Sequence, residues 1–333
     1  MVNPEQALGD LRAHLNAPGW RERARQAALS VAIPTYRREG YLIQTLASLA
    51  ACDPLPGEVL VVDQTQAHEA ETTLALESAV AAGFVRWLRH QPPSATASRN
   101  RALREAQGEV LLFLDDDVSV DPGLIEAHWR RYQEDPWLAG VAGRVVEPDF
   151  PSAPLPYHFR ISLSGRVRHN YEFEALCETR GGAGCNVSLR RNVGLSVGGF
   201  DERFVGSANN EDADFIARLA ERGRFLYDPA ASLVHHAARR GGGRSREGDA
   251  ERMRVYFHND AYYFLRRAQA WQVPLYLARQ PLTSLRIAQG AYERVFPGLP
   301  LGPAAFPRAL AACTQGVLAG FRTYLRSKAA SEL

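Results

Sequence analysis

The first third of the chain alternates short apolar runs with segments of helical periodicity, and this alternation restricts the possible folds more than any other feature. The apolar runs predict strands at 29–35, 58–65 and 109–114, and the periodic segments between them predict helices at 41–52, 70–83 and 94–108. The runs are almost continuously apolar, which is typical of strands covered by helices on both faces. The pattern therefore predicts an α/β fold with a Rossmann-like, mostly parallel sheet flanked by helices.

Polar or turn-forming residues stand at the carboxyl ends of the predicted strands. The first strand ends at Pro34-Thr35-Tyr36, the second reaches Asp63, and EVLLFL leads directly into Asp115-Asp116-Asp117. Ligands of parallel α/β sheets collect at the carboxyl ends of the strands. We therefore expect these three segments to meet at one cleft.

Three consecutive aspartates repel one another, so a metal ion, a basic side chain or a proton must offset their charge. Mg²⁺ and Mn²⁺ prefer oxygen ligands and usually share them with substrate phosphates. Side chains two positions apart on an extended segment point the same way, so Asp115 and Asp117 could hold one ion. We predict a Mn²⁺ or Mg²⁺ site there.

A calcium-binding loop is an alternative explanation for the same segment, because residues 115–126 place oxygen-bearing side chains at most ligand positions of such a loop. However, Val120 stands where the loop needs glycine for a sharp turn, and a strand precedes the segment instead of a helix. A merely solvated or helix-capping carboxylate remains open for Asp121.

The second half of the chain is less regular. We expect a helix with an acidic first turn at 210–223, two short strands around a turn at 224–236, and a mobile glycine-rich loop at 238–249. The remaining residues read as helices broken at Pro274 and Pro281. The chain thus divides into an N-terminal helical extension at 1–28, an α/β domain at 29–238, and a flexible loop with a C-terminal helical region at 239–333.

Charge is distributed unevenly along the chain. Residues 237–333 contain 15 Lys+Arg and 6 Asp+Glu, whereas residues 1–236 contain 24 and 31. A basic tail suits anionic lipid, nucleic acid or a phosphorylated substrate, and a solvated arginine-rich helix surface explains it equally well.

Location is predicted from the cysteines and the apolar segments. The four cysteines show no metal-ligand spacing, the first residues lack the pattern of a secretory signal, and no uncharged apolar stretch is long enough to span a membrane. We expect a cytoplasmic protein, with peripheral contact at the inner face of the membrane left open by the basic tail.

Seven segments in a fixed order resemble glycosyltransferase family 2. They are SVAIPTYRR, VLVVDQT, ASRNRALREAQGEVLLFLDDD, GGAGCNVSLRR, GGFDERF, NEDADFIARLAERG and LVHH, which together span roughly residues 29–236. The resemblance implies a GT-A catalytic domain over 29–238, inverting chemistry and a nucleotide-diphospho-sugar donor.

The resemblance also implies roles for individual residues around the donor. Pro34, Thr35 and Tyr36 would line the nucleotide pocket, and Asp63 would bind the base, for which a uracil or thymine imide is a suitable donor. Arg99 and Asn100 would lie near the nucleotide or diphosphate. Asp115 would approach the ribose or the metal, Asp116 the sugar, and Asp117 and His235 the metal, with His236 as the alternative to His235. The segment QTQAHEAE after Asp63 departs from the family's usual small polar and acidic run.

An acceptor hydroxyl is a weak nucleophile and needs a base across the sugar from the leaving group. The resemblance assigns this role to Asp212, at the start of the predicted acidic helix, where a helix N-terminus would keep the carboxylate ionised. Simple helix capping by Asn210 is the competing explanation of the NED motif.

The partners implied are a nucleotide-sugar donor and a saccharide or lipid-linked acceptor, with no nucleic acid. Two other functions compete: a sugar-nucleotide pyrophosphorylase-like enzyme, and a non-catalytic carbohydrate-binding module. The first would need a Lys-bearing, glycine-rich phosphate loop, which IPTYRREGY does not supply. The glycine-rich segment at Arg239 to Arg246 could close over a diphosphate.

Overall fold

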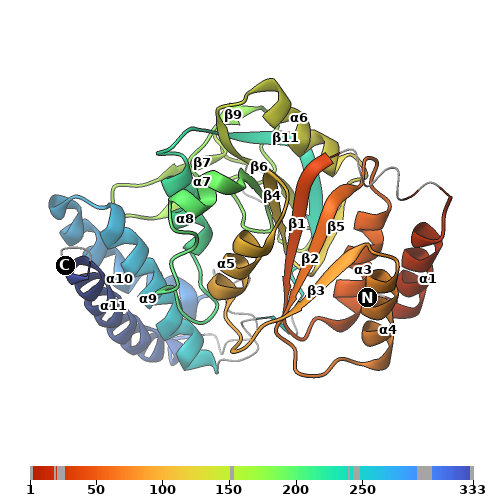
Figure 1. The fold of residues 1–333 in the computed structure, drawn as a ribbon. Helices are drawn as coiled ribbons and strands as arrows, with labels where there is room; N and C mark the ends of the chain where they lie inside the picture. The colour runs from red at the N-terminus through yellow and green to blue at the C-terminus, as the bar shows by residue number, and fades with distance from the viewer. Residues whose placement is uncertain are drawn as a thin grey trace.

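The computed structural model describes residues 3–18, 20, 27–150, 154–238, 241–242, 248–290 and 302–330. Its centre is a nine-stranded sheet with the order β3-β2-β1-β4-β10-β6-β11-β5, to which β9 adds by pairing with β11 (Figure 1). The strands are β1 (Ala27–Thr35), β2 (Pro56–Asp63), β3 (Val85–Arg89), β4 (Val110–Leu114), β5 (Val118–Val120), β6 (Leu138–Val146), β9 (Cys177–Glu178), β10 (Asn186–Arg190) and β11 (Arg224–His235).

Strands β1 to β4 pair in parallel, and β6 pairs in parallel with β11. Strand β10 runs antiparallel to β4 and β6, and β5 and β9 run antiparallel to β11. The predicted α/β architecture with its Rossmann-like sheet and C-terminal helices is confirmed, although the part of the sheet beyond β4 is mixed.

Helices cover both faces of the sheet, which explains the continuously apolar strands. On β4, Leu112 and Leu114 pack into one hydrophobic cluster while Leu111 and Phe113 pack into another. The helices that contribute to the first cluster are α1 (Pro4–Leu15), α3 (Glu39–Ala50), α4 (Ala70–Ala81) and α6 (Leu124–Glu134), and those that contribute to the second are α5 (Ala95–Glu105) and α8 (Glu211–Leu219).

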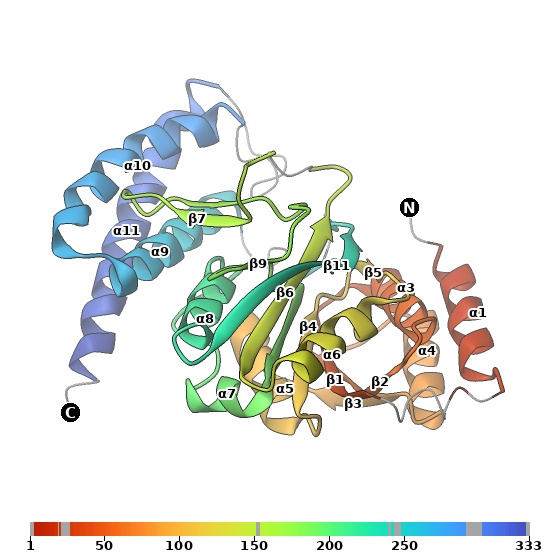
Figure 2. The ribbon, with the colours of Figure 1, turned by 90° about the horizontal axis from the view of Figure 1, so that it is seen from above.

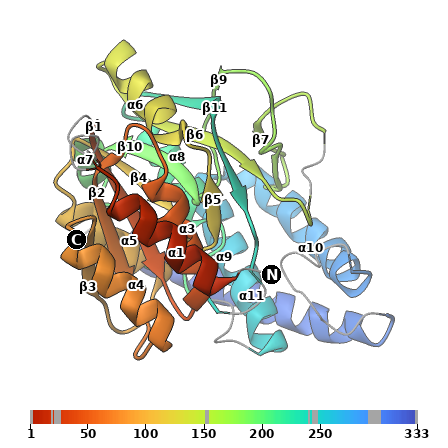
Figure 3. The same ribbon diagram turned by 90° about the vertical axis from the view of Figure 1, so that its right-hand side faces the viewer.

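The N-terminal helix α1 lies outside α3 and α4 at one end of the molecule (Figure 3). It begins at Asn3, whose side chain accepts a hydrogen bond from Gln6 N at 3.3 Å, and Pro4 suits the first helical position. Of the predicted helical extension at 1–28, α1 covers residues 4–15, and residues 1, 2, 19 and 21–26 lie outside the described part of the chain.

Two predictions are wrong, one about residues 224–236 and one about the segment of the three aspartates. Residues 224–235 form one strand, β11, because a register shift between Asp228 and Ser232 lets the strand continue past Pro229. The three aspartates do not lie on an extended segment: the chain turns at 116–117 and returns as β5, which pairs with the end of β11.

The C-terminal region consists of α9 (Asp249–Arg267), a short 3₁₀ helix (Ala270–Gln272), α10 (Val273–Ala288) and α11 (Ala305–Ala329). Pro274 begins α10, but α10 continues through Pro281, so the predicted break there is wrong. Residues 159–169 form a separate hairpin of β7 (Phe159–Ile161) and β8 (Val167–His169), which lies beside α10 (Figure 2). No described helix is long and apolar enough to cross a membrane.

Candidate active site

A cavity of about 260 Å³ lies at the carboxyl ends of β1 and β4, as the sequence predicts. Its walls include the end of β1, the turn between β4 and β5, the first turn of α8, the end of β11, residues of α5 and the loop that leads into β10. Among the predicted site residues, those in the wall are Pro34, Thr35, Tyr36, Arg99, Asp115, Asp116, Asp117, Asp212 and His235. Asp63 and Asn100 are not among the lining residues.

Basic side chains from distant parts of the chain meet the three aspartates. Arg38 lies 3.1 Å from the carboxylate of Asp117 and 3.6 Å from that of Asp116, and Arg99 lies 3.1 Å from that of Asp115. Burial raises the pKa of Asp116 to about 7, a shift that Arg38 opposes and the charge of Asp117 reinforces. Two of the three predicted ways to offset the charge, a basic side chain and a proton, therefore operate together.

Asp117 is the most tightly held of the three carboxylates. It is 2% exposed, and its Oδ2 accepts a hydrogen bond from Ala238 N at 2.8 Å. Burial acts to raise its pKa, but hydrogen bonds and charge from His235 and Arg38 outweigh burial and lower the pKa. Asp117 therefore stays ionised, which is the state that a metal ligand needs.

Asp115, Asp117 and His235 form a possible metal site, because one ligand atom from each lies within 4.8 Å of the other two. His235 Nε2 is 3.2 Å from Asp117, and His235 Nδ1 is 2.6 Å from Glu147 Oε1. A carboxylate on the far ring nitrogen is a common way to aim an imidazole at a metal. Two carboxylates and one imidazole suit Mn²⁺ or Mg²⁺, so the residues present fit the predicted ion.

The alternative ligand, His236, points elsewhere. Its Nε2 lies 2.8 Å from Ser119 Oγ, and burial lowers its pKa. For His235, burial acts to lower the pKa, but the hydrogen bonds to Asp117 and Glu147 raise it to about 10. His235 therefore carries a proton on the metal-free protein, and that proton must leave before Nε2 can bind an ion.

Sequence reasoning missed two members of this site, Arg38 and Glu147. Both follow predicted strands closely, Arg38 after PTYR and Glu147 after VAGRVV. Position at a strand end was a usable signal for both, but nothing in the sequence pairs Glu147 with a histidine 88 residues away.

Asp212 belongs to the first turn of α8, which forms another side of the smaller cavity. Its carboxylate accepts hydrogen bonds from Gly184 N at 3.0 Å and Ala213 N at 2.7 Å. Burial nevertheless raises its pKa, contrary to the expectation that the helix N-terminus would dominate, and a raised pKa makes Asp212 a stronger base. The capping explanation of the NED motif is wrong, because Asn210 has a φ of 70° and its side chain makes no cap hydrogen bond.

Arg99 links the two sides of the cavity. One guanidinium nitrogen lies 2.6 Å from Glu211 and another 3.1 Å from Asp115. Burial and the charge of Asp212 raise the pKa of Glu211 against the opposing charge of Arg99. Arg99 thus holds the acidic first turn of α8 beside the aspartates at the end of β4.

Asn100 points away from the cavity, into the loop before α8. Its amide donates to Phe200 O at 2.9 Å and accepts from Phe200 N at 2.7 Å, so its side chain fixes this loop. The structure does not bring Asn100 to the site of a bound nucleotide.

Asp63 is fully buried at the end of β2. Its Oδ2 accepts from Trp87 Nε1 at 2.8 Å and lies 2.9 Å from His68 Nε2, and its Oδ1 accepts from Thr65 N at 2.8 Å. These contacts occupy the carboxylate that was predicted to bind the base. The next residue, Gln64, lines the cavity instead and accepts from Ser94 N at 2.6 Å.

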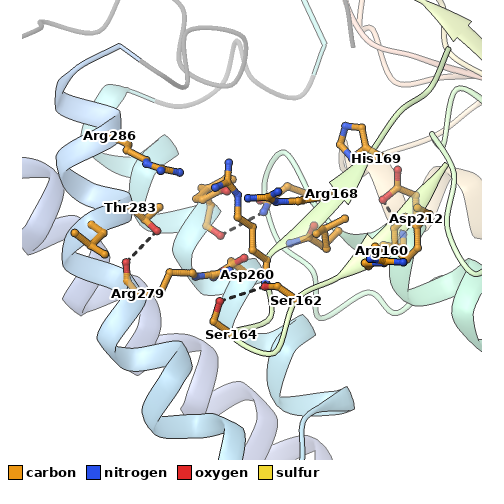
Figure 4. A pocket seen from close by; sticks show the side chains of 18 of the residues that line it. Arg160, Ser162, Ser164, Arg168, His169, Asp212, Asp260, Arg279, Thr283 and Arg286 are labelled. Carbon is orange, nitrogen blue, oxygen red and sulfur yellow. Dashed lines mark hydrogen bonds and ion pairs between the residues drawn. The ribbon is translucent and has the colours of Figure 1, made fainter. Parts of the chain in front are cut away.

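A second and larger cavity, about 810 Å³, lies between the β7–β8 hairpin and α10 (Figure 4). Asp212 and Tyr171 belong to the walls of both cavities. Within the segment GGAGCNVSLRR, Gly182 lines the larger cavity and Gly184 the smaller. The carboxylate of Asp212 therefore stands where two separate compartments meet.

Comparisons with known proteins agree with this geometry. Residues 30–194 match the family model of Glycosyl transferase family 2. The chain is 27% identical over 149 residues to the glucosyl-dolichyl phosphate glucuronosyltransferase of Haloferax volcanii, covering 41% of this chain and 46% of the relative. It is 28% identical over 208 residues to the succinoglycan biosynthesis protein ExoM of Rhizobium meliloti, covering 61% and 65%. The chain thus spans less than two thirds of these curated relatives.

Solved structures share the fold at low sequence identity. The mannosyltransferase PcManGT from Pyrobaculum calidifontis, in complex with GDP-Man and Mn²⁺, matches with a TM-score of 0.51 at 18% identity over 98% of this chain and 95% of that one. GalNAc-T7 with UDP, GalNAc and Mn²⁺ matches with a TM-score of 0.58 at 14% identity over 86% and 54%. The family match over residues 30–194, the relatives and the common architecture together support a glycosyltransferase of family 2 with the GT-A fold.

Proposed function

We propose that this protein is an inverting, metal-dependent glycosyltransferase. It would move a sugar from a nucleotide-diphospho-sugar, UDP- or dTDP-linked, to a hydroxyl of a saccharide or lipid-linked acceptor in polysaccharide or glycoconjugate synthesis. The observation that carries the proposal is the position of Asp212, in the walls of two cavities at once.

The smaller cavity suits the donor. Asp115, Asp117 and His235 would hold Mn²⁺ or Mg²⁺, and such an ion offsets the charge of the diphosphate as it leaves. Arg38 and Arg99 lie beside these aspartates and add fixed positive charge to the same region. The solved neighbours GalNAc-T7 and PcManGT contain a nucleotide and Mn²⁺, which supports the choice of ligands.

The larger cavity suits the acceptor, with Asp212 between the two sugars. Asp212 accepts the proton of the acceptor hydroxyl while that oxygen bonds to the anomeric carbon and the bond from this carbon to the diphosphate breaks. Attack from the side opposite the leaving group inverts the anomeric configuration. The backbone N–H groups of Gly184 and Ala213 fix the orientation of the carboxylate for this step.

We retain the division into an extension at 1–28, a catalytic domain at 29–238 and a C-terminal region at 239–333 as part of the proposal. Of the segment proposed to close over the diphosphate, Arg239–Arg246, only Gly241 and Gly242 lie within the described residues. Gly242 N donates to Tyr36 O at 2.7 Å, so this part of the chain crosses the predicted nucleotide pocket.

Two substitutions test the proposal. With Mn²⁺ and a panel of UDP- and dTDP-sugars, wild-type protein should release nucleoside diphosphate slowly by hydrolysis. Asp117→Asn should lose metal-dependent donor binding, measured by calorimetry. Asp212→Asn should bind the donor normally but turn over more slowly by about 10²- to 10⁴-fold, the usual contribution of a general base.

Wild-type turnover by Asp212→Asn would refute the base assignment. Donor binding that is indifferent to Mn²⁺ in the wild type, or unchanged in Asp117→Asn, would refute the metal assignment. A protein that binds no nucleotide-sugar of the panel would leave the carbohydrate-binding module as the better hypothesis.

A further inference from the structure

The larger cavity is strongly basic. Arginines from two separate elements line it, namely Arg160, Arg166 and Arg168 from the β7–β8 hairpin and Arg279 and Arg286 from α10. Figure 4 shows Arg168 and Arg286 reaching into the space between the hairpin and α10, while Asp212 and His169 lie at the end away from α10. Arg168 and Arg286 thus lie in a different part of the compartment from the proposed catalytic base, whereas Arg160 is drawn on the side of Asp212 (Figure 4).

The acidic residues of the wall do not balance these arginines. Asp260 lies 2.6 Å from Arg279 and accepts a hydrogen bond from Tyr276, so this carboxylate is already used. Asp212 is the other acidic residue of the wall. Among the described residues, no carboxylate lies within 4.0 Å of a nitrogen of Arg160, Arg166, Arg168 or Arg286. The charge of these four arginines therefore has no carboxylate partner among the described residues, although the Cζ of Arg160 lies 4.5 Å from the centroid of the Tyr157 ring.

Solvated arginines are common on open surfaces, but this arrangement is different in two respects. The wall is concave, and a cleft lined by charge of one sign concentrates the field and raises the local concentration of opposite charge. The like charges also come from two separate elements that face the same cavity, so they repel one another across it. Guanidinium groups match phosphate oxygens in a two-pronged geometry, which lysine cannot reproduce.

We propose that this cavity binds an acceptor that carries a phosphate or diphosphate group, with Arg168 and Arg286 holding the anion and the acceptor hydroxyl lying at Asp212. The inference rests on the proposed function, since it assigns the acceptor class of that same site. It gives the larger cavity a role beyond space for a sugar: its basic part selects the acceptor by charge.

The rim of the cavity indicates the source of the phosphate. Leu163 at the hairpin tip is 63% exposed, and Leu282 and Leu285, which line the cavity on α10, are 62% and 41% exposed. Gln272 Nε2 donates to Leu163 O at 3.1 Å, which holds the hairpin tip against the start of α10. Apolar side chains beside the arginines of the cavity wall suit an amphiphile, so we expect a lipid phosphate to bind more tightly than a sugar phosphate.

Binding of defined probes tests the proposal without knowledge of the natural acceptor. Affinities of dodecyl phosphate, glucose 1-phosphate, glucuronate and neutral dodecyl maltoside are measured by calorimetry in EDTA. The double variant R168Q/R286Q should bind both phosphates more weakly, by roughly tenfold for each arginine, because a charge-assisted hydrogen bond contributes about one decade of affinity. The matched control R322Q/R326Q removes the same charge from exposed positions on α11 and should bind them as the wild type does.

The outcomes separate the two proposals. Equal loss in both double variants, or no loss in R168Q/R286Q, would overturn the phosphate site, and so would tighter binding of glucuronate than of either phosphate. Tighter binding of dodecyl phosphate than of glucose 1-phosphate supports a lipid acceptor, and equal affinities support recognition of phosphate alone. Metal-dependent donor hydrolysis by wild-type protein is measured separately and decides the proposed function. If hydrolysis occurs but the phosphate probes give one of the overturning results, only the acceptor assignment is wrong.

Discussion

At the scale of single residues, the orientation of His235 depends on Glu147, which is 4% exposed and lies 2.6 Å from its Nδ1. Partners of this kind typically contribute 10- to 100-fold to metal affinity. We expect Glu147→Gln to weaken Mn²⁺ binding by about that factor, measured by calorimetry on the intact protein. Asp149→Asn, an exposed change two residues away, is the control and should leave the affinity unchanged. Equal effects of both substitutions would show that Glu147 acts only through overall charge.

A second residue-scale prediction concerns His128, which is fully buried with Asn186 Oδ1 2.9 Å from Nε2 and Ser188 Oγ 2.8 Å from Nδ1. Burial lowers its pKa to about 4, below the ordinary value near 6.5, so the unfolded chain binds a proton more readily than the native protein between these values. Its stabilising contribution is therefore complete above pH 6.5 and is lost as the pH falls toward 4. Urea unfolding at pH 7.5 and pH 5 should show a loss that is about 2 kcal/mol larger for the wild type than for His128→Gln. Identical losses would contradict this assignment.

Residue identities were more predictable than residue contacts. Asp115 and Asp117 stood out because adjacent carboxylates at a strand end have few structural reasons to be there, whereas the role of His235 came only from the resemblance. Arg38 and Glu147 did not stand out, because their roles exist only through pairing across distant segments. For Asp63 and Asn100, the resemblance supplied a ligand role, whereas in this chain nearby donors and the Phe200 backbone occupy their side chains.

At the scale of elements, the close contact between α9 and α11 depends on glycine. A Cβ at Gly320 would lie 2.6 Å from His258 O and 2.8 Å from the Cβ of Ala261, and one at Gly316 would collide with Arg254 O. Gly320→Ala should therefore destabilise the protein by about 1–3 kcal/mol, a typical cost of overpacking. Gly9→Ala, in α1 with open space around it, should instead raise stability by about 0.5–1 kcal/mol through helix propensity. Thermal unfolding of both variants provides the comparison, and stabilisation by both would mean that α11 can move away from α9.

Elements with strong local patterns were predicted well. Strands β1, β2 and β4 and helices α3, α4 and α5 combine length with clear periodicity or continuous apolar character. Strand β5 has three residues and exists only because it pairs with β11. The single long β11 and the continuous α10 were missed for the opposite reason. Pro229 and Pro281 usually end a strand or a helix, but here pairing in the sheet and packing of the helix let both elements continue.

At the scale of the whole molecule, the basic tail is partly explained by the acidic body. Arg266 lies 2.9 Å from Asp214 and 3.0 Å from Asp201, and Arg267 lies 3.3 Å from Asp214. Tyr262 and Tyr263 of α9 pack with Ala213 of α8 and with the loop before it, whereas Phe257 and Phe264 pack with residues of α10 and α11. Arg286, in contrast, lines the larger cavity and has no carboxylate within 4.0 Å among the described residues, a difference that residue counts along the sequence could not reveal.

The pairing of β6 with β11 matches Val146 with Val234, so Glu147 and His235 emerge next to each other from adjacent strands. His235 and His236 are chemically the same, and successive side chains of a strand face opposite sides. The alignment of two strands in the sheet therefore decides which imidazole lies between Asp117 and Glu147. A slip of one position would turn His235 to the other face of the sheet and away from both carboxylates, with every amino acid still in place.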